Sequence, residues 1–132
     1  MKKISSLQND STLPLLTLVT SNENLQDVLK SSIDSQRYQL LTANTASEGL
    51  NLIDGLPLTD GAQKTDVAKI ALVDLILEDI DGLSFIEELR ARHRSLHIIA
   101  IMCKKELAAI DMTAESITLM ASKCGANAVF TA

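Results

Sequence analysis

The stretch Ile70-Ala71-Leu72-Val73-Asp74-Leu75-Ile76-Leu77-Glu78-Asp79-Ile80-Asp81-Gly82 decides the fold of this chain. Four apolar residues lead directly into Asp74, and an Asp-Gly pair then begins a helical pattern. A continuous apolar run is typical of a strand that is buried on both faces of a parallel sheet. Ligands of such sheets bind at the carboxyl ends of the strands, which places Asp74 at the mouth of a candidate site. An aspartate at this position can equally be a turn former or a helix cap.

Strands and helices alternate along the rest of the chain. We expect strands at 15–19, 38–41, 70–74, 97–102 and 127–131. We expect helices to begin near Asn22, at Asn44 or Thr45, near Gly82, and at Met112 or Thr113, and Gly125 to end the last of them. This order predicts an α/β fold, with a five-stranded parallel sheet and helices on both of its faces.

The helical spacing of apolar residues predicts which side chains face the core. The first helix should bury Leu25, Val28, Leu29 and Ile33, and the last should bury Ile117, Met120, Ala121 and Cys124. Residues 1–12 are polar and are expected to form a flexible segment before a single domain at 13–132. We expect a long loop at 55–69 and an irregular connection at 104–112.

The composition limits the class of protein. The chain has 132 residues, of which 46% are hydrophobic and 22% charged, as in one globular domain. A net charge of −5 and the scarcity of aromatic residues argue against binding to nucleic acid. We find neither a signal peptide nor a stretch long enough to span a membrane. Cys103 and Cys124 fit a reducing compartment, so we expect a cytoplasmic protein.

Several kinds of site can be excluded from the sequence. It contains no GxxxxGK[ST], GxGxxG or GxSxG motif, which argues against a P-loop, a dinucleotide site and a hydrolase elbow. His93 and His97 have the spacing of metal ligands on a helix, but the helix is expected to end between them, so their side chains should diverge. No metal or cofactor is therefore expected from these motifs.

The segment from Leu72 to Leu83 resembles the phospho-acceptor region of response-regulator receiver domains, in which an apolar strand, an acceptor aspartate and an Asp-Gly pair follow one another. The segment from Gly125 to Thr131 resembles the turn and fifth strand of the same family. The resemblance extends from Leu15 to the C-terminus. It implies a flavodoxin-like (CheY-like) sheet of order 2-1-3-4-5 with Asp74 as phospho-acceptor. The family's fifth helix is expected to be absent from this chain.

The positions that support phosphorylation in the family differ here. The family's acidic pair is replaced by Thr20 and Ser21, its strand-four hydroxyl by Met102 followed by Cys103, its lysine by Ala132, and its proline by Glu78. Mg²⁺, which offsets the charge of donor and acceptor, is implied only if the site works. Glu23, near the lost pair, Asp74 and the carbonyl of Ile76 are then the candidate ligands.

Three hypotheses follow for function. The first is a pseudo-receiver, not an enzyme, that works in two-component signalling by contacts between proteins around the fourth main helix and the fifth strand. Its partners would be signalling proteins or an output domain, with no nucleic acid and no membrane. The second is a working receiver in a phosphorelay that switches through Asp74. The third is a phosphohydrolase with Asp74 as nucleophile, which is disfavoured because Ile76 stands where that class has a second acid.

Two further expectations concern surfaces. With only the first helix on one face of the sheet, aliphatic surface of strands one, three and five should be uncovered, which predicts self-association. The acid cluster of the resembled site is thinner here, so repulsion of the Asp74 carboxylate should be weak, and Asp74→Asn is expected to change stability by less than about 1 kcal/mol, as at an exposed polar position.

Overall fold

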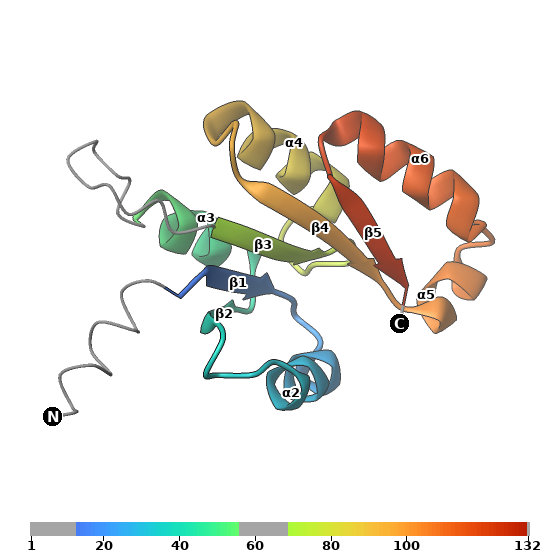
Figure 1. Cartoon of the computed structure of the whole chain (residues 1–132). Helices are drawn as coiled ribbons and strands as arrows, with labels where there is room; N and C mark the ends of the chain where they lie inside the picture. Colours follow the sequence, from blue (N-terminus) through green and yellow to red (C-terminus); the bar gives the residue numbers. More distant parts are fainter. Residues whose placement is uncertain (1–12, 56–68, 132) are drawn as a thin grey trace, which may run out of the picture.

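Five parallel strands form the centre of the molecule (Figure 1). The computed structural model describes residues 13–55 and 69–131. The strands are β1 (Leu15–Val19), β2 (Gln39–Ala43), β3 (Lys69–Asp74), β4 (His97–Met102) and β5 (Ala128–Thr131). They are arranged in the order β2-β1-β3-β4-β5, and every neighbouring pair is parallel. The predicted fold class and strand order are confirmed.

Within the described residues, five helices pack around this sheet: α2 (Glu23–Ser32), α3 (Ala46–Asp54), α4 (Gly82–Arg92), α5 (Lys104–Ala109) and α6 (Ala114–Cys124). Four of them begin at residues whose side chains accept a hydrogen bond from the first turn, namely Asn22, Thr45, Asp81 and Thr113. Gly125 ends α6 with φ at 120°, a conformation that favours glycine. Local capping chemistry therefore sets most of the helix boundaries.

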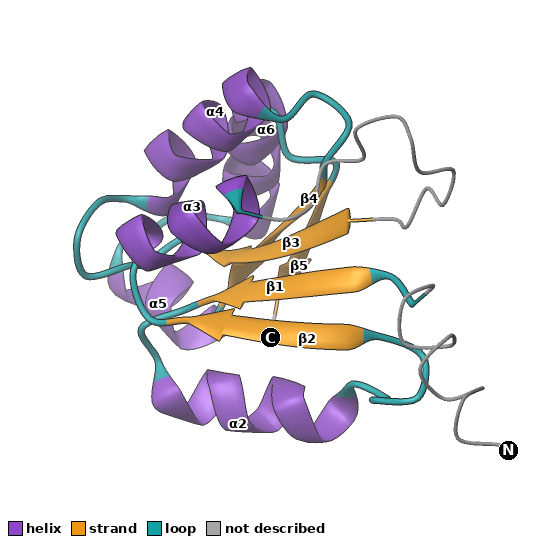
Figure 2. Cartoon of the chain, turned by 90° about the vertical axis from the view of Figure 1, so that its left-hand side faces the viewer, coloured by secondary structure: helices purple, strands orange, loops and turns teal. Residues whose placement is uncertain are grey.

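The two faces of the sheet are covered unequally. Helices α3, α4 and α6 lie on one side, and α2 lies on the other (Figure 2). The larger apolar cluster, which includes Val73, Phe85 and Ile98, fills the first side. A smaller cluster of Leu18, Leu25 and Ile101 lies under α2. Among the described residues, no helix follows β5.

Some expected positions were wrong. Val28 and Met120 were expected to be buried, but 59% and 40% of these residues are exposed, because the apolar stripe on each helix is wider than the surface that covers it. The connection expected to be irregular contains the short helix α5. Among the described residues, the sheet surface without a helix comes from β3, β4 and β5 rather than β1, because Leu16 and Leu18 of β1 are buried and Leu18 packs in the cluster under α2.

The expectation of a flexible segment at 1–12 falls on residues that the structure does not describe, and so does most of the long loop expected at 55–69. The segment 1–12, the loop residues 56–68 and Ala132 are not among the described residues. Within the described ranges, none of the helices is both long enough and apolar enough to cross a membrane.

Two buried threonines in and after β1 provide a matched pair for a test of stability. Thr17 and Thr20 are each 1% exposed, but the Thr17 hydroxyl has no hydrogen-bond partner in the described structure, whereas the Thr20 hydroxyl has two. Thr17→Val is expected to raise the free energy of unfolding by about 1 kcal/mol, and Thr20→Val to lower it by about 2 kcal/mol. Urea denaturation at pH 7 measures both, and a Thr17→Val variant that is less stable than the parent contradicts the expectation.

Candidate functional site

Asp74 is the last residue of β3, and the sheet surrounds it. β3 lies between β1 and β4, and Asp74 is paired with Ile101 of β4. The backbone continues this register for one more residue, since Leu75 N donates to Ile101 O at 3.0 Å. Asp74 is 1% exposed. The expectation of an exposed carboxylate at a site mouth is therefore wrong, because the apolar neighbours and the following loop cover it.

Both carboxylate oxygens of Asp74 accept hydrogen bonds. The Thr20 hydroxyl donates to Oδ2 at 2.6 Å, and Ile76 N donates to Oδ1 at 3.0 Å. The Thr20 hydroxyl in turn accepts a hydrogen bond from Asn22 N at 3.0 Å. Asn22 is the N-cap of α2, so these bonds connect the end of β3 to the start of that helix. The carboxylate is held from within the protein by neutral donors.

Burial dominates the electrostatics of Asp74. Removal from water raises the pKa of its carboxyl, and the hydrogen bonds from Thr20 and Ile76 oppose that rise without reversing it. The ionised form of Asp74 is therefore less stable in the folded protein than in water.

A second carboxyl group, which the sequence analysis did not single out, lies close to this point. Burial and the negative charge of Asp74 raise the pKa of Glu106, in the first turn of α5. Burial, then Glu106 and Asp74, raise the pKa of the neighbouring Cys103 thiol, so that thiol is protonated at neutral pH. The spacing of Glu106 three residues after the N-cap position of α5 was the available signal.

The loop after Asp74 is tied to two other loops. Asp79 accepts hydrogen bonds from Ala46 N and Ser47 N at 2.9 and 3.0 Å, at the start of α3. Although partial burial acts to raise it, these backbone bonds hold the pKa of Asp79 below its ordinary value. Ser21 accepts from Glu78 N at 3.2 Å and donates to Asn44 O. The loop is therefore fixed against the ends of β1 and β2.

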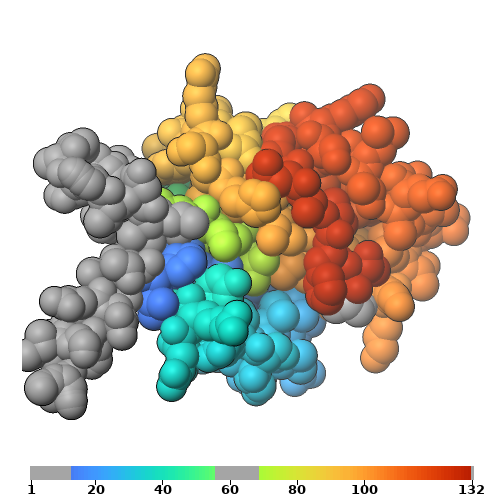
Figure 3. All heavy atoms as spheres, in the orientation of Figure 1, coloured from blue at the N-terminus to red at the C-terminus, as the bar shows by residue number. Residues whose placement is uncertain are grey.

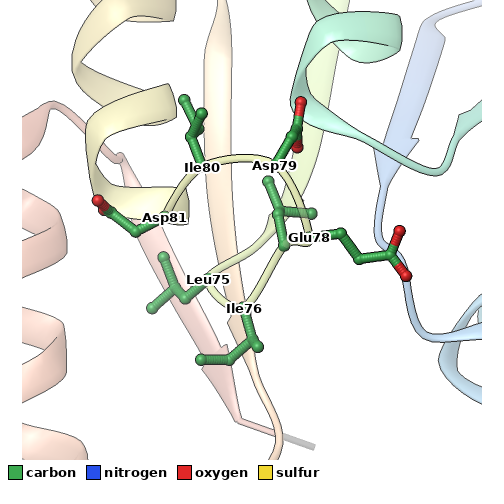
Figure 4. Close-up of a pocket in the computed structure, with 7 residues that line it drawn as sticks. Leu75, Ile76, Glu78, Asp79, Ile80 and Asp81 are labelled. Atoms are coloured by element: carbon green, nitrogen blue, oxygen red, sulfur yellow. The ribbon is translucent and has the colours of Figure 1, made fainter.

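An open, shallow pocket lies within this loop, between residues 75 and 81 (Figure 4). The labelled side chains diverge from the ribbon, and Glu78 extends toward the β1 side rather than back toward the end of β3. Ile76 and Ile80 are exposed on it. Asp74 is buried and does not line this pocket.

The structure brings together only some of the predicted site residues. Thr20 and Cys103 lie near Asp74, and Ser21 reaches the loop that follows it. Met102 packs in the larger apolar cluster instead. Glu23 is exposed on α2, and Glu78 and Ile76 take part through their backbone N–H groups, which donate to Ser21 and Asp74. The position of Ala132 lies outside the described residues.

These residues do not fit a Mg²⁺ site. Mg²⁺ needs oxygen ligands in near-octahedral geometry, usually with one or two carboxylates. Here Asp74 is 1% exposed, and each of its carboxylate oxygens accepts a hydrogen bond from within the protein, so the carboxylate is not presented to a hydrated cation. In the part of the chain that the structure describes, no group of three or more His, Cys, Asp or Glu could hold a metal ion. His93 contacts Asp54 at 2.7 Å, away from His97.

The raised pKa of Asp74 leads to a pH-dependent prediction. Because the folded-state pKa lies above the ordinary value of 3.8, the ionised carboxylate destabilises the protein at pH 7. Asp74→Asn should therefore raise the free energy of unfolding by about 1 kcal/mol at pH 7. The gain should shrink as the pH falls through the raised pKa, since the parent carboxyl then becomes neutral. Urea denaturation at several pH values measures this, and a loss of several kcal/mol would show that Asp74 is a structural cap.

The fold is similar to that of solved receiver domains. A response regulator receiver domain protein from Methanospirillum hungatei JF-1 matches with a TM-score of 0.67 at 19% identity, over 90% of this chain and 81% of that one. The receiver domain of NtrX from Brucella abortus matches with a TM-score of 0.65 at 18% identity, over 88% and 83%. A response regulator from Burkholderia pseudomallei, solved with a phosphorylated aspartic acid and a calcium ion, matches with a TM-score of 0.64 at 21% identity, over 89% and 59%.

Sequence comparison adds no relative to this structural likeness. No protein-family model matches the chain, and no curated protein matches it. The similarity rests on the parallel sheet order and on coverage of about nine tenths of the chain. The chain therefore has the fold of response-regulator receiver domains.

Proposed function

We propose that this chain is a cytoplasmic signalling module of the two-component type that has lost phosphorylation and acts through contacts with other proteins. It is not an enzyme in this proposal, and Asp74 is a buried remnant of an acceptor. The partners would be signalling proteins or an output domain, and the module would bind neither nucleic acid nor membrane. The proposal also includes self-association.

The hydrogen bond between Thr20 and Asp74 is the observation that carries this proposal. A phospho-acceptor must present a carboxylate oxygen to the donor, with cations to offset the charge of both groups. At 2.6 Å, the Thr20 hydroxyl occupies Oδ2 of a carboxylate that is 1% exposed. A neutral hydroxyl stabilises the buried carboxylate but supplies no charge for a divalent cation. This supports a site in which the Asp74 carboxylate is not accessible to a phosphodonor or a divalent cation.

Exposed apolar side chains support protein contacts at α6 and β5. Leu119 and Met120 are exposed on α6, which packs beside β5. Neighbouring exposed apolar side chains that form a continuous patch are typical of contact surfaces, whereas single ones are common on any protein surface. This surface is the one proposed for contact with an output domain or a signalling protein.

Titration with Mg²⁺ tests the loss of the metal site. The protein as it stands should show no saturable binding of Mg²⁺ at millimolar concentration by calorimetry, and no rise in melting temperature. Thr20→Asp, which places a second carboxylate beside Asp74, should be less stable without the ion and should gain stability when Mg²⁺ is added. Glu23→Gln is the matched control, because it changes a nearby exposed acid that does not contact Asp74. Saturable binding by the parent that Asp74→Asn removes would favour a working receiver.

A further inference from the structure

Among the described residues, no helix covers the α2 side of the sheet over β3, β4 and β5. The side chains of Ile70 and Leu72 on β3, Ile99 on β4, and Ala128 and Phe130 on β5 point to the same side as α2. We call these five residues the open sheet face. Figure 3 shows β3, β4 and β5 reaching the surface beside α2, without a helix across them. Phe130 is 51% exposed there.

Val28 on α2 extends this apolar surface beyond the strands. Leu25 points down into the small cluster, and Gln26 bonds to Asn44 beyond the end of β2. At 100° per residue, Val28 lies on the flank of α2 opposite to Gln26, which is the flank beside β3 and β4. The open sheet face therefore has an exposed apolar side chain at each border, Val28 on one side and Phe130 on the other.

The open sheet face is uncharged in an acidic protein. All five of its residues are apolar. The whole chain carries a net charge of −5, so two copies repel each other over most of their surfaces. This face is where two copies can meet without opposing like charges.

We propose that the open sheet face is the contact between two copies of this chain. A two-fold axis through the face places α2 of each copy beside β5 of the other, which brings Val28 of one copy toward Phe130 of the second copy. Under this symmetry, the border that carries Val28 in each copy meets the border that carries Phe130 in the other. The open sheet face is therefore self-complementary. Insertion of the α2 outer face into the open region is disfavoured, because Asp27, Lys30 and Ser31 are exposed on it. The two sheets therefore pack directly against each other.

The size of the face sets the expected strength of the dimer. Three strands at a spacing of about 4.8 Å, each of four to six residues, form a small patch. Stable specific interfaces bury about 1,200–2,000 Å² in total, and this patch lies at or below the lower end of that range. The dimer should therefore be in fast, concentration-dependent exchange with monomer. This inference does not depend on whether Asp74 is phosphorylated.

Sedimentation velocity of the full chain between micromolar and millimolar concentration tests the proposal. The parent should change from monomer to dimer over this range. Val28→Asp, on the helix surface, and Phe130→Asp should each weaken the dimer by about tenfold or more, because each buries a carboxylate in the contact. Circular dichroism checks that each variant is folded.

Leu119→Asp is the matched control. Leu119 is as exposed as Val28 but lies on α6, on the other side of the sheet. It should leave the dimer unchanged while removing a side chain from the surface proposed for other partners. A parent that stays monomeric at every concentration would overturn the proposal, even if it bound an added helix or an apolar dye. A dimer that Leu119→Asp breaks and Val28→Asp does not would overturn it as well.

Discussion

Incubation with acetyl phosphate and Mg²⁺ is expected to leave this protein at its unmodified mass, under conditions in which an ordinary receiver domain is phosphorylated. The groups that support phosphorylation in the family are replaced by Thr20 and Ser21, by Met102 and by Ala132. Of these, the Thr20 hydroxyl is already bonded to the buried carboxylate of Asp74, and Met102 lies in the apolar core.

The expected effect on the rate is large. Each charged hydrogen bond or ion pair to the transferring group is worth about 1.5–3 kcal/mol. The loss of several such interactions should slow the reaction by several orders of magnitude, even when their effects are not additive. Intact mass spectrometry over hours measures this, with a receiver domain that retains the acidic pair as positive control.

One outcome would reverse the assignment. A gain of one phosphoryl group that depends on Mg²⁺ and disappears in Asp74→Asn would mean that the Thr20–Asp74 hydrogen bond opens readily. The protein would then be a working receiver that switches through Asp74. Modification that persists in Asp74→Asn would instead come from another residue and would leave the proposal standing.

The strands and most helix starts were predictable because local chemistry determines them. The apolar run into Asp74 can be satisfied only by burial on both faces, and Asn22, Thr45 and Thr113 each cap a helix with their own side chain. The helix α5 was missed because it has six residues, and its N-cap, Cys103, makes no side-chain capping bond. Short segments of good helix formers carry too little periodicity to be distinguished from a loop.

The prediction that Val28 and Met120 are buried was wrong, and the reason cannot be found in the sequence of either helix alone. Apolar spacing shows which side of a helix can be buried, but neighbouring elements decide how much of that side is covered. α2 is the one described helix on its face of the sheet, so Val28 at its flank has nothing above it. The open sheet face follows from the same shortage of helices.

The sequence predicted where the candidate site lies, but it did not predict the hydrogen bonds or the burial of Asp74. The strand end and the replaced neighbours could be read from the sequence. The Thr20–Asp74 bond joins residues 54 apart, and the Asp79–Ala46 bond joins residues 33 apart. Both depend on strand adjacency and on side-chain geometry after folding. The burial of Asp74 could not be predicted either, because the loop that covers it is itself polar in places and is fixed by those distant bonds.

Gly82→Ala is expected to be the most damaging single substitution to the fold around Asp74. A Cβ at position 82 would overlap the Cα of Leu75 and would lie 2.6 Å from the carbonyl oxygen of Asp74. Both obstacles are backbone atoms, so no side-chain rotation can relieve the contact. Gly82 N also donates to Leu75 O at 3.0 Å, which fixes the first turn of α4 against the end of β3.

The variant must therefore separate α4 from β3 or distort the loop between them. We expect it to lower the free energy of unfolding by about 3 kcal/mol or more, because overpacking against backbone cannot relax locally. Urea denaturation at pH 7 measures the loss. Gly55→Ala is the matched control, since Gly55 ends α3 in a right-handed helical conformation, and its nearest obstacle is at 3.2 Å. That control should change stability by less than about 1 kcal/mol.

Gly82→Ala also tests whether the close approach of α4 to the end of β3 keeps Asp74 buried. If the close approach of α4 to the end of β3 keeps Asp74 buried, Gly82→Ala should also expose the carboxylate and lower its pKa toward the ordinary value of 3.8. Titration by NMR of the Asp74 carboxyl carbon follows this directly. A Gly82→Ala protein with unchanged stability and an unchanged Asp74 titration would show that the contact between the two backbones is looser than its distances indicate.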